Sequence, residues 1–136
     1  RVAAQKIAAR NGRRDPNHDF GTNPCSEIIL RSNQFCNLSE IVVREDDTEE
    51  TLKAKAEVAA IIGTLQATLT DFRYLRNIWK KNTEEEALLG VSMTGIMDNK
   101  LLSTPNSPHC EVVLEAVRDL SLRQCLAFLS RHRQPV

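Results

Sequence analysis

The chain contains 136 residues, enough for one domain, and its 18 Lys and Arg residues balance its 18 Asp and Glu residues. This balance excludes the net basic field of a typical nucleic-acid-binding protein and the acidic excess of a disordered one, so we expect no direct nucleic-acid partner. No apolar run is long enough to span a bilayer, so we expect no membrane partner either.

The four cysteines are too widely spaced for the disulfide framework of a small secreted domain. We therefore expect reduced thiols and a cytoplasmic protein. The first residue is Arg1, and a basic, Ala-rich stretch follows it in place of the apolar segment of a signal peptide. We accordingly expect the chain to begin inside a longer protein.

The first ten residues predict a helix, because Ala, Gln, Lys and Arg dominate them. Val2, Ile7 and Ala8 can share an apolar stripe on this helix. The pair Asn11-Gly12 predicts the end of the helix, since these residues favour the backbone conformation that closes a helix.

Residues 13–20 form a polar connector. The pair Arg13-Arg14 offers a phosphate contact, although paired charges on a loop are usually solvated. His18 lies among aspartates, but one histidine with scattered aspartates lacks the spacing of metal ligands. We therefore predict that His18 is an ordinary loop residue and that the connector holds no metal.

A turn signal follows the connector. Gly21 and Pro24 predict the turn, and an apolar run from Ile28 to Leu30 comes directly after it. A polar tip that continues into an apolar strand is a common way for a loop to present side chains from a buried scaffold.

Three chemically useful side chains lie in this turn: the amide of Asn23, the thiol of Cys25 and the carboxyl of Glu27. If the loop is extended, alternate residues point the same way and one face carries all three. Cys25 would then be the reactive thiol, Glu27 would exchange a proton, and Asn23 would orient a hydroxyl. The spacing alone favours the alternative, a turn with a buried cysteine and a solvated glutamate.

Two further apolar runs, residues 35–43 and 88–95, join Ile28 to Leu30 as predicted strands. The runs are nearly continuous rather than alternating, which is typical of strands buried on both faces in α/β proteins. Gly90 and Gly95, both in the last run, indicate close backbone approach to another strand or a ligand. Cys36 lies at the start of the second run, where a core thiol is the alternative to a reactive one.

A long helix is predicted over residues 48–72. The pair Asp47 and Glu50 fits an N-terminal cap, and Gly63 would allow close packing. The apolar surface is wider than one stripe, so we expect burial on more than one side. That surface is formed by Leu52, Ala56, Ala59, Ala60, Ile62, Leu65 and Leu69.

The remaining residues predict packing rather than chemistry. We expect the aromatic residues Phe72, Tyr74 and Trp79 to pack together. Residues 84–87 fit the acidic start of a helical turn. A last helix begins at Ser107-Pro108, and Cys110 and Cys125 on it are predicted packing residues.

Two motifs together resemble a known family. Asn-Pro-Cys-Ser-Glu over Asn23 to Glu27, followed by Phe-Cys-Asn-Leu-Ser-Glu over Phe35 to Glu40, closely resembles the active-site finger loop of ribonucleotide reductases. Gly-Thr-Asn-Pro-Cys, from Gly21, is similar to the adenosylcobalamin-dependent class. The resemblance extends from about Arg13 to about Ser121. It implies an α/β fold, namely part of a reductase-type barrel with its finger loop and long covering helices, so that residues 1–136 form one partial domain.

The resemblance also implies a role for each site residue. Cys25 matches the cysteine that becomes a thiyl radical and removes the ribose 3′ hydrogen. Glu27 matches the carboxylate that takes the 3′-hydroxyl proton, and Asn23 matches the amide that holds the ribose hydroxyls. Cys36 matches one of two cysteines that are oxidised to a disulfide as the 2′-hydroxyl leaves as water.

The function implied is reduction of ribonucleotides, with triphosphates as the expected substrates, adenosylcobalamin as cofactor and a thioredoxin-like or dithiol reductant. Alternatives that stay open are a diphosphate reductase with a separate radical-generating subunit, a non-catalytic α/β interaction module, and a metal site from Cys25, Cys36, His18 and Cys110. The last fits no usual zinc spacing.

The C-terminal part departs from the family pattern. After about Ser121 the family continues to further strands and a phosphate-binding loop, and an upstream cysteine pairs with the position of Cys36. This sequence shows neither. We therefore expect the chain to be inactive alone and to fold poorly, because strands buried on both faces need neighbours.

Overall fold

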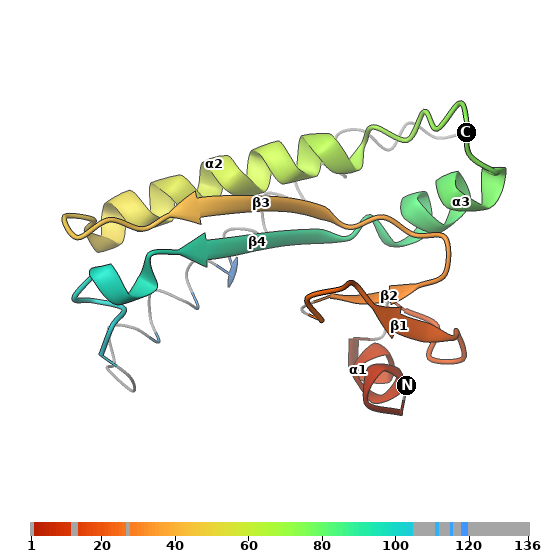
Figure 1. Ribbon diagram of the computed structural model, residues 1–136, viewed down its shortest axis with the longest axis horizontal. Coiled ribbons are helices and arrows are strands. Elements are labelled where there is room, and N and C mark those ends of the chain that lie inside the picture. Colours follow the sequence, from red (N-terminus) through yellow and green to blue (C-terminus); the bar gives the residue numbers. More distant parts are fainter. Residues whose placement is uncertain are drawn as a thin grey trace. The chain divides into compact units, whose positions relative to one another are not determined.

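The computed structural model of the chain describes residues 2–11, 14–26 and 28–104, together with residues 111, 115, 118 and 119. The described part is mixed α/β, with three α-helices and two sheets of two strands each (Figure 1). The α/β class is thus confirmed, whereas no closed barrel is present among the described residues. The expected start of the last helix at Ser107, with Cys110 and Cys125, lies outside them, whereas the described residues 111, 115, 118 and 119 of that helix are helical.

The backbone divides into two compact units, which are described separately. The hairpin unit comprises residues 1–37 and 67–88, and the helix–sheet unit comprises residues 38–66 and 89–136. None of the helices in the described part is long and apolar enough to cross a membrane.

The hairpin unit begins with α1, Val2–Asn11, which confirms the first predicted helix. Its strands β1, Phe20–Thr22, and β2, Ile29–Arg31, pair antiparallel, with Phe20 opposite Arg31. Ala4 and Ala8 of α1 are buried against Phe20. The predicted stripe was wrong for Val2 and Ile7, which are exposed, because the helix contacts the hairpin through its small alanine face.

The same unit contains α3, Asn77–Glu86. Residues 84–87 are therefore the end of a helix, and their interpretation as a helix start was wrong. Ala87 closes the helix in the left-handed conformation, and its N–H donates to the carbonyl of Thr83 at 2.8 Å. An acidic C-terminal turn opposes the helix dipole, so the carboxylates need another partner.

Aromatic packing in this unit is partly as predicted. The ring of Phe35 lies 5.0 Å from that of Phe72 and 4.7 Å from that of Trp79, distances typical of attractive aromatic pairs. Tyr74 does not join them, since it is 98% exposed.

In the helix–sheet unit, β3, Asn37–Val42, pairs with β4, Leu89–Thr94. The strands run parallel (Figure 1), and the N–H of Val43 continues the ladder to the carbonyl of Thr94 at 2.9 Å. Both strands were predicted. Burial on both faces was not confirmed for β3, where Ile41 is buried but its neighbour Val42 is exposed.

Helix α2, Glu49–Ala67, lies along this sheet (Figure 1). The hydroxyl of Ser39 in β3 donates to the carbonyl of Ala59 at 2.9 Å. A Cβ at Gly63 would overlap the side chain of Leu89, which confirms the predicted close packing. Thr48, directly before the helix, caps it, because its hydroxyl accepts from the N–H of Thr51 at 3.4 Å, so the predicted Asp47–Glu50 cap was wrong.

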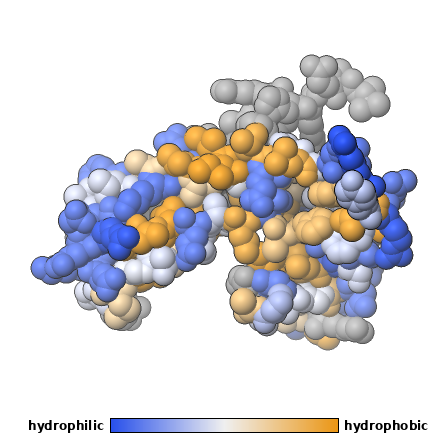
Figure 2. Space-filling view, turned by 45° about the horizontal axis from the view of Figure 1, so that its top comes forward, coloured by the Kyte–Doolittle hydropathy of each residue, from blue (hydrophilic) through white to orange (hydrophobic). Residues whose placement is uncertain are grey.

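Only one side of α2 is buried in the described part, contrary to the prediction. The buried side contributes Leu52 and Ala56 to a core with Val43 and Leu102. The other side exposes an apolar surface, which Figure 2 shows as a band of hydrophobic atoms. That surface is formed by Val58, Ile61, Ile62 and Leu65.

The sheet ends in a tight connection to a 3-10 helix, η1, Ile96–Asp98. Gly95 has a φ of 77°, in the region that favours glycine. A Cβ at this position would overlap the backbone carbonyl oxygen of Val43. The close backbone approach predicted at Gly95 is thus confirmed.

Asp47 ties the end of β3 to the start of α2. Its carboxylate accepts from the N–H of Arg44 at 2.7 Å, from the hydroxyl of Thr51 at 2.9 Å and from the ammonium of Lys55. The hydrogen bond from Lys55 lowers the pKa of Asp47, against a smaller opposing effect of burial. Because the pKa is lower in the folded state, Asp47 stabilises the fold above its unfolded pKa, and this contribution is lost as pH falls through the folded value.

We predict that Asp47→Asn lowers the free energy of unfolding by about 1–3 kcal/mol at neutral pH, the usual effect of disrupting a hydrogen-bonded charge. The difference from wild type should begin to shrink below about pH 4, the ordinary pKa of an aspartate, and should vanish only below the lowered pKa of the folded state, where the wild-type carboxyl is neutral as well. Denaturant unfolding at both pH values measures this. Asp46→Asn is the control, because Asp46 is adjacent and exposed; equal effects of the two substitutions would contradict the prediction.

Candidate functional site: the hairpin tip and the second thiol

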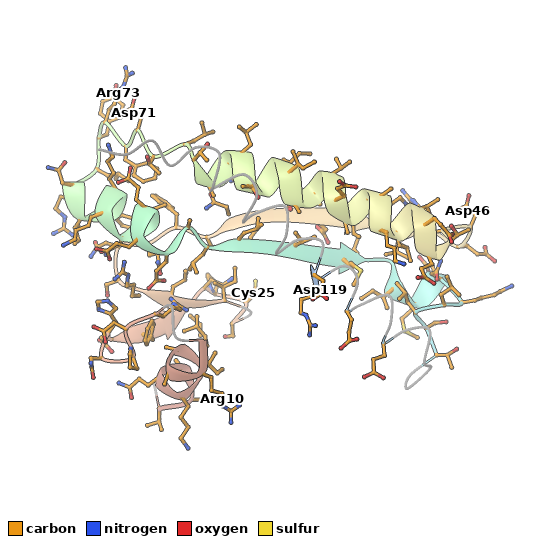
Figure 3. The ribbon with its side chains drawn as sticks, turned by 180° about the vertical axis from the view of Figure 1, so that it is seen from behind. Arg10, Cys25, Asp46, Asp71, Arg73 and Asp119 are labelled. Carbon is orange, nitrogen blue, oxygen red and sulfur yellow. The ribbon has the colours of Figure 1, made fainter. Side chains whose placement is uncertain are left out.

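The tip of the β1–β2 hairpin carries Cys25, whose thiol is free and exposed (Figure 3). The tip is a tight turn in which the N–H of Ser26 donates to the carbonyl of Asn23 at 3.0 Å. Pro24 occupies the second position of this turn, where its fixed φ is favoured. Ser26 then takes a φ of 65°, which turns the chain back toward β2.

The side chain of Asn23 closes the tip. Its Oδ1 accepts from the N–H of Ile28 at 3.0 Å, and its own backbone N–H donates to the carbonyl of Ile28 at 3.3 Å. A side chain that bonds to the backbone in this manner is typical of asparagine in turns. Asn23 therefore holds the turn that carries Cys25.

The tip is not the extended loop that the sequence analysis assumed. The argument that alternate residues share one face therefore does not apply to Asn23 and Cys25, which lie in one tight turn instead. Glu27, the predicted proton acceptor, lies outside the described residues.

The second predicted thiol, Cys36, is free and half-buried immediately before β3. Both Gln34 and Asn37 are buried beside it. The N–H and the side-chain amide of Asn37 both donate to the carbonyl of Leu88, at 3.2 and 3.0 Å. Cys36 thus lies on a segment whose backbone is fixed on either side of it.

The base of the hairpin holds two buried arginines that sequence reasoning missed. Arg14 was expected to be solvated. Its guanidinium instead lies over the ring of Phe20, 4.7 Å from the ring centre, and its Nη1 donates to the carbonyl of Ile29 at 2.9 Å. Arg31 ends β2 with only 7% of its side chain exposed. The signal available in the sequence was an arginine directly after an apolar strand, together with a distant run of three glutamates.

His18 belongs to this cluster. Its Nε2 lies 2.7 Å from Nη1 of Arg31, and its ring meets that of Phe20 edge-on at 6.2 Å. Within the described residues, no three His, Cys, Asp or Glu side chains gather in a way that could hold a metal ion. Cys110, the fourth residue of the metal alternative, lies outside them.

Glu85 of α3 provides an electrostatic partner for Arg31. Its carboxylate accepts a hydrogen bond from Nη2 of Arg31, which lowers the pKa of Glu85. The carboxyl therefore stays charged at neutral pH. This pair joins the hairpin to the last turn of the helix.

Comparison with known proteins finds enzymes to which the chain is similar. The chain is 36% identical over 96 residues to the adenosylcobalamin-dependent ribonucleoside-triphosphate reductase of Lacticaseibacillus paracasei. It is 35% identical over 80 residues to the enzyme of that name from Lactobacillus helveticus, and 32% identical over 80 residues to that from Lactobacillus leichmannii. No family model and no solved structure matches the chain.

The matches cover 68% of this chain for the first relative and 57% for the other two. The chain spans only 12% of the first relative's length and 10% of the others'. The predicted resemblance of this chain to a short segment of the adenosylcobalamin-dependent ribonucleotide reductases is thereby confirmed.

Proposed function

We propose that this chain is the thiol-bearing segment of an adenosylcobalamin-dependent ribonucleotide reductase, which reduces ribonucleoside triphosphates to deoxyribonucleotides for DNA synthesis in the cytoplasm. The observation that carries the proposal is the exposed Cys25 thiol on a hairpin tip closed by Asn23. The similarity to relatives named as such reductases supports it.

The exposure of Cys25 fits the cofactor named in these relatives. When bound, adenosylcobalamin supplies the radical that removes the hydrogen atom of the Cys25 thiol. A thiol that gives up its hydrogen atom to a bound group and then acts on a substrate must be reachable from outside its own loop, as this one is.

In the proposed reaction, the sulfur radical of Cys25 takes the hydrogen atom from ribose C3′, and Glu27 takes the 3′-hydroxyl proton. The 2′-hydroxyl leaves as water after it receives a proton. Cys36 and a second thiol together supply two electrons and become a disulfide. Cys25 then returns its hydrogen atom to C3′, so that one ribonucleotide and one dithiol give one deoxyribonucleotide, one disulfide and water.

A thioredoxin-like protein or a small dithiol would reduce that disulfide after each turnover. The second thiol would come from an upstream cysteine of the whole protein, as in the family.

For the surrounding fold we propose part of a reductase-type α/β barrel. The parallel pairing of β3 with β4 supports this proposal, because parallel strands occur mainly in larger sheets covered by helices. The exposed apolar side of α2 is consistent with further packing.

The relatives do not favour the alternatives. Those reported above are all named as triphosphate reductases, which argues for triphosphates over a diphosphate reductase and against a non-catalytic interaction module.

We predict that Cys25→Ser abolishes turnover in the holoenzyme and leaves nucleotide binding nearly unchanged, because a serine hydroxyl does not form a radical of comparable energy. Single-turnover formation of deoxynucleotide measures the effect, and equilibrium nucleotide binding is the control. Deoxynucleotide formed at the wild-type rate would remove Cys25 from the reaction.

For Cys36→Ser, we predict that product formation stops while the first step survives. Tritium release from the ribose 3′ position reports that first step, which needs Cys25 but not Cys36. Repeated turnover of this variant with a dithiol reductant would show that Cys36 only packs.

Two substitutions separate the two roles of Asn23 that are to be tested, which are closing the turn and donating hydrogen bonds to ribose hydroxyls. Asn23→Asp keeps an oxygen for the N–H of Ile28 but removes the amide donors, whereas Asn23→Ala removes both. If Asn23 donates to ribose hydroxyls, both variants should lose about tenfold or more in kcat/KM, the effect of about one hydrogen bond. A wild-type kcat/KM for Asn23→Asp would limit Asn23 to closing the turn.

A further inference from the structure

A buried carboxylate, Glu86, lies between the two buried arginines at the base of the hairpin. Only 5% of its side chain is exposed. One oxygen, Oε2, lies 2.7 Å from Nη2 of Arg14, and the other, Oε1, lies 3.4 Å from Nε of Arg31. Both contacts are ion pairs rather than aligned hydrogen bonds. The carboxylate of Glu86 is therefore paired with both buried arginines, and Arg31 is also paired with Glu85.

Through the arginines, Glu86 holds the hairpin that carries Cys25. Arg31 is the last residue of β2, and Arg14 donates to the carbonyl of Ile29, the first residue of β2. Both ends of β2, the strand that follows the hairpin tip, are thus attached to Glu86 through Arg14 and Arg31. The tip connects β1 to β2, so its direction follows from the base of the hairpin.

The same carboxylate also holds the segment that carries Cys36. The side-chain amide of Gln34 donates to Oε2 of Glu86 at 2.7 Å, and its Oε1 accepts from the N–H of Arg31 at 3.1 Å. Gln34 lies two residues before Cys36 and is buried. Glu86 is therefore bonded to one segment leading from Cys25 and to another leading into Cys36.

Asn82, one turn earlier on α3, supports both attachments. Its carbonyl accepts from Nη2 of Arg31 at 3.1 Å and from Nε2 of Gln34 at 3.3 Å. Its side-chain amide donates to the carbonyls of Ser32 and Asn33, at 2.9 and 3.3 Å. The whole connection between the two thiol-bearing segments is thus fixed on the C-terminal half of one helix.

We propose that Glu86 and Arg31 are positioning residues that fix the Cys25 thiol relative to the Cys36 thiol. The inference rests on the proposed function, in which Cys25 acts first on the ribose and Cys36 completes the reduction of the same ribose. Both thiols must then meet one substrate molecule in a set geometry. Misplacement by about 1 Å can cost a catalysed step roughly a hundredfold.

The two steps depend differently on this geometry. Removal of the 3′ hydrogen needs Cys25 to be at the ribose, whereas loss of the 2′-hydroxyl needs Cys36 to be correctly placed at the same time. When the second step is impaired, the first can reverse and exchange the 3′ hydrogen without product. The ratio of 3′-tritium release to deoxynucleotide formed therefore reports relative position, and it is unaffected when a variant merely reduces the folded fraction.

The test uses the holoenzyme with a 3′-tritiated ribonucleoside triphosphate, adenosylcobalamin and a small dithiol. Glu86→Gln keeps the shape of the side chain but leaves two buried guanidinium groups without their shared counter-charge. We expect its ratio of tritium release to product to rise by about threefold or more. Glu84→Gln is the matched control, because Glu84 lies on the same helix but accepts from the exposed Thr70 hydroxyl; its ratio should equal that of wild type.

Arg31→Lys provides a second variant in case Glu86→Gln does not fold. It keeps the positive charge, but one ammonium group cannot replace the contacts that the guanidinium makes with His18, Asn82 and Glu85. The ratio of tritium release to product should therefore also rise in Arg31→Lys.

Wild-type ratios in Glu86→Gln and Arg31→Lys, whatever their thermal stability, would overturn the inference and leave the proposed function standing. An equal rise in Glu84→Gln would overturn it as well, because the effect would then not belong to the buried cluster. If the wild-type enzyme released no tritium, the proposed function would fail and the inference with it.

Discussion

The hairpin depends on buried charge. Its two strands have three residues each, and a hairpin of that size is at best marginally stable by itself. It is held by Phe20, which packs on α1, and by Arg31, which binds α3. Breaking one partner of a buried ion pair typically costs about 3–5 kcal/mol, so the direction of the hairpin is strongly coupled to its charged base.

The buried base that supports the hairpin is thus separate from the exposed tip that carries the Cys25 thiol. The base is buried and makes many contacts, whereas the tip exposes Cys25 on the turn closed by Asn23. A reactive group on a short loop with a fixed base can meet a substrate with little loss of conformational freedom. Cys36 is supported in the same way, since the buried residues Gln34 and Asn37 lie on either side of it.

Much of the fold could be predicted from the sequence because it follows from local patterns. The apolar runs that became β2, β3 and β4, and the long alanine-rich helix α2, all have strong periodic or compositional signals. The predicted burial of β3 on both faces was wrong, because an apolar run indicates a strand without fixing what covers its faces. Helix α3 was missed because its buried residues, Asn82 and Thr83, are polar.

The geometry of the candidate site was not predicted correctly from the sequence. The motif identified Cys25 and Asn23, yet Pro24 and the positive φ of Ser26 make a turn where spacing suggested an extended loop. The charged base was missed for a different reason. Arg31 and Glu86 are far apart in the sequence, and a run of three glutamates is normally read as a solvated helix surface. Only the fold reveals that one of them faces two arginines.

The central claim is that the Cys25 thiol lies where a ribonucleotide binds. Alkylation of Cys25 in the whole protein, followed by peptide mass mapping, tests it most directly with and without a ribonucleoside triphosphate. Inorganic triphosphate is the control for a binding site that recognises phosphate alone. We predict that the ribonucleotide slows alkylation of Cys25 severalfold and that inorganic triphosphate does not. Equal alkylation rates with and without saturating ribonucleotide would contradict the claim.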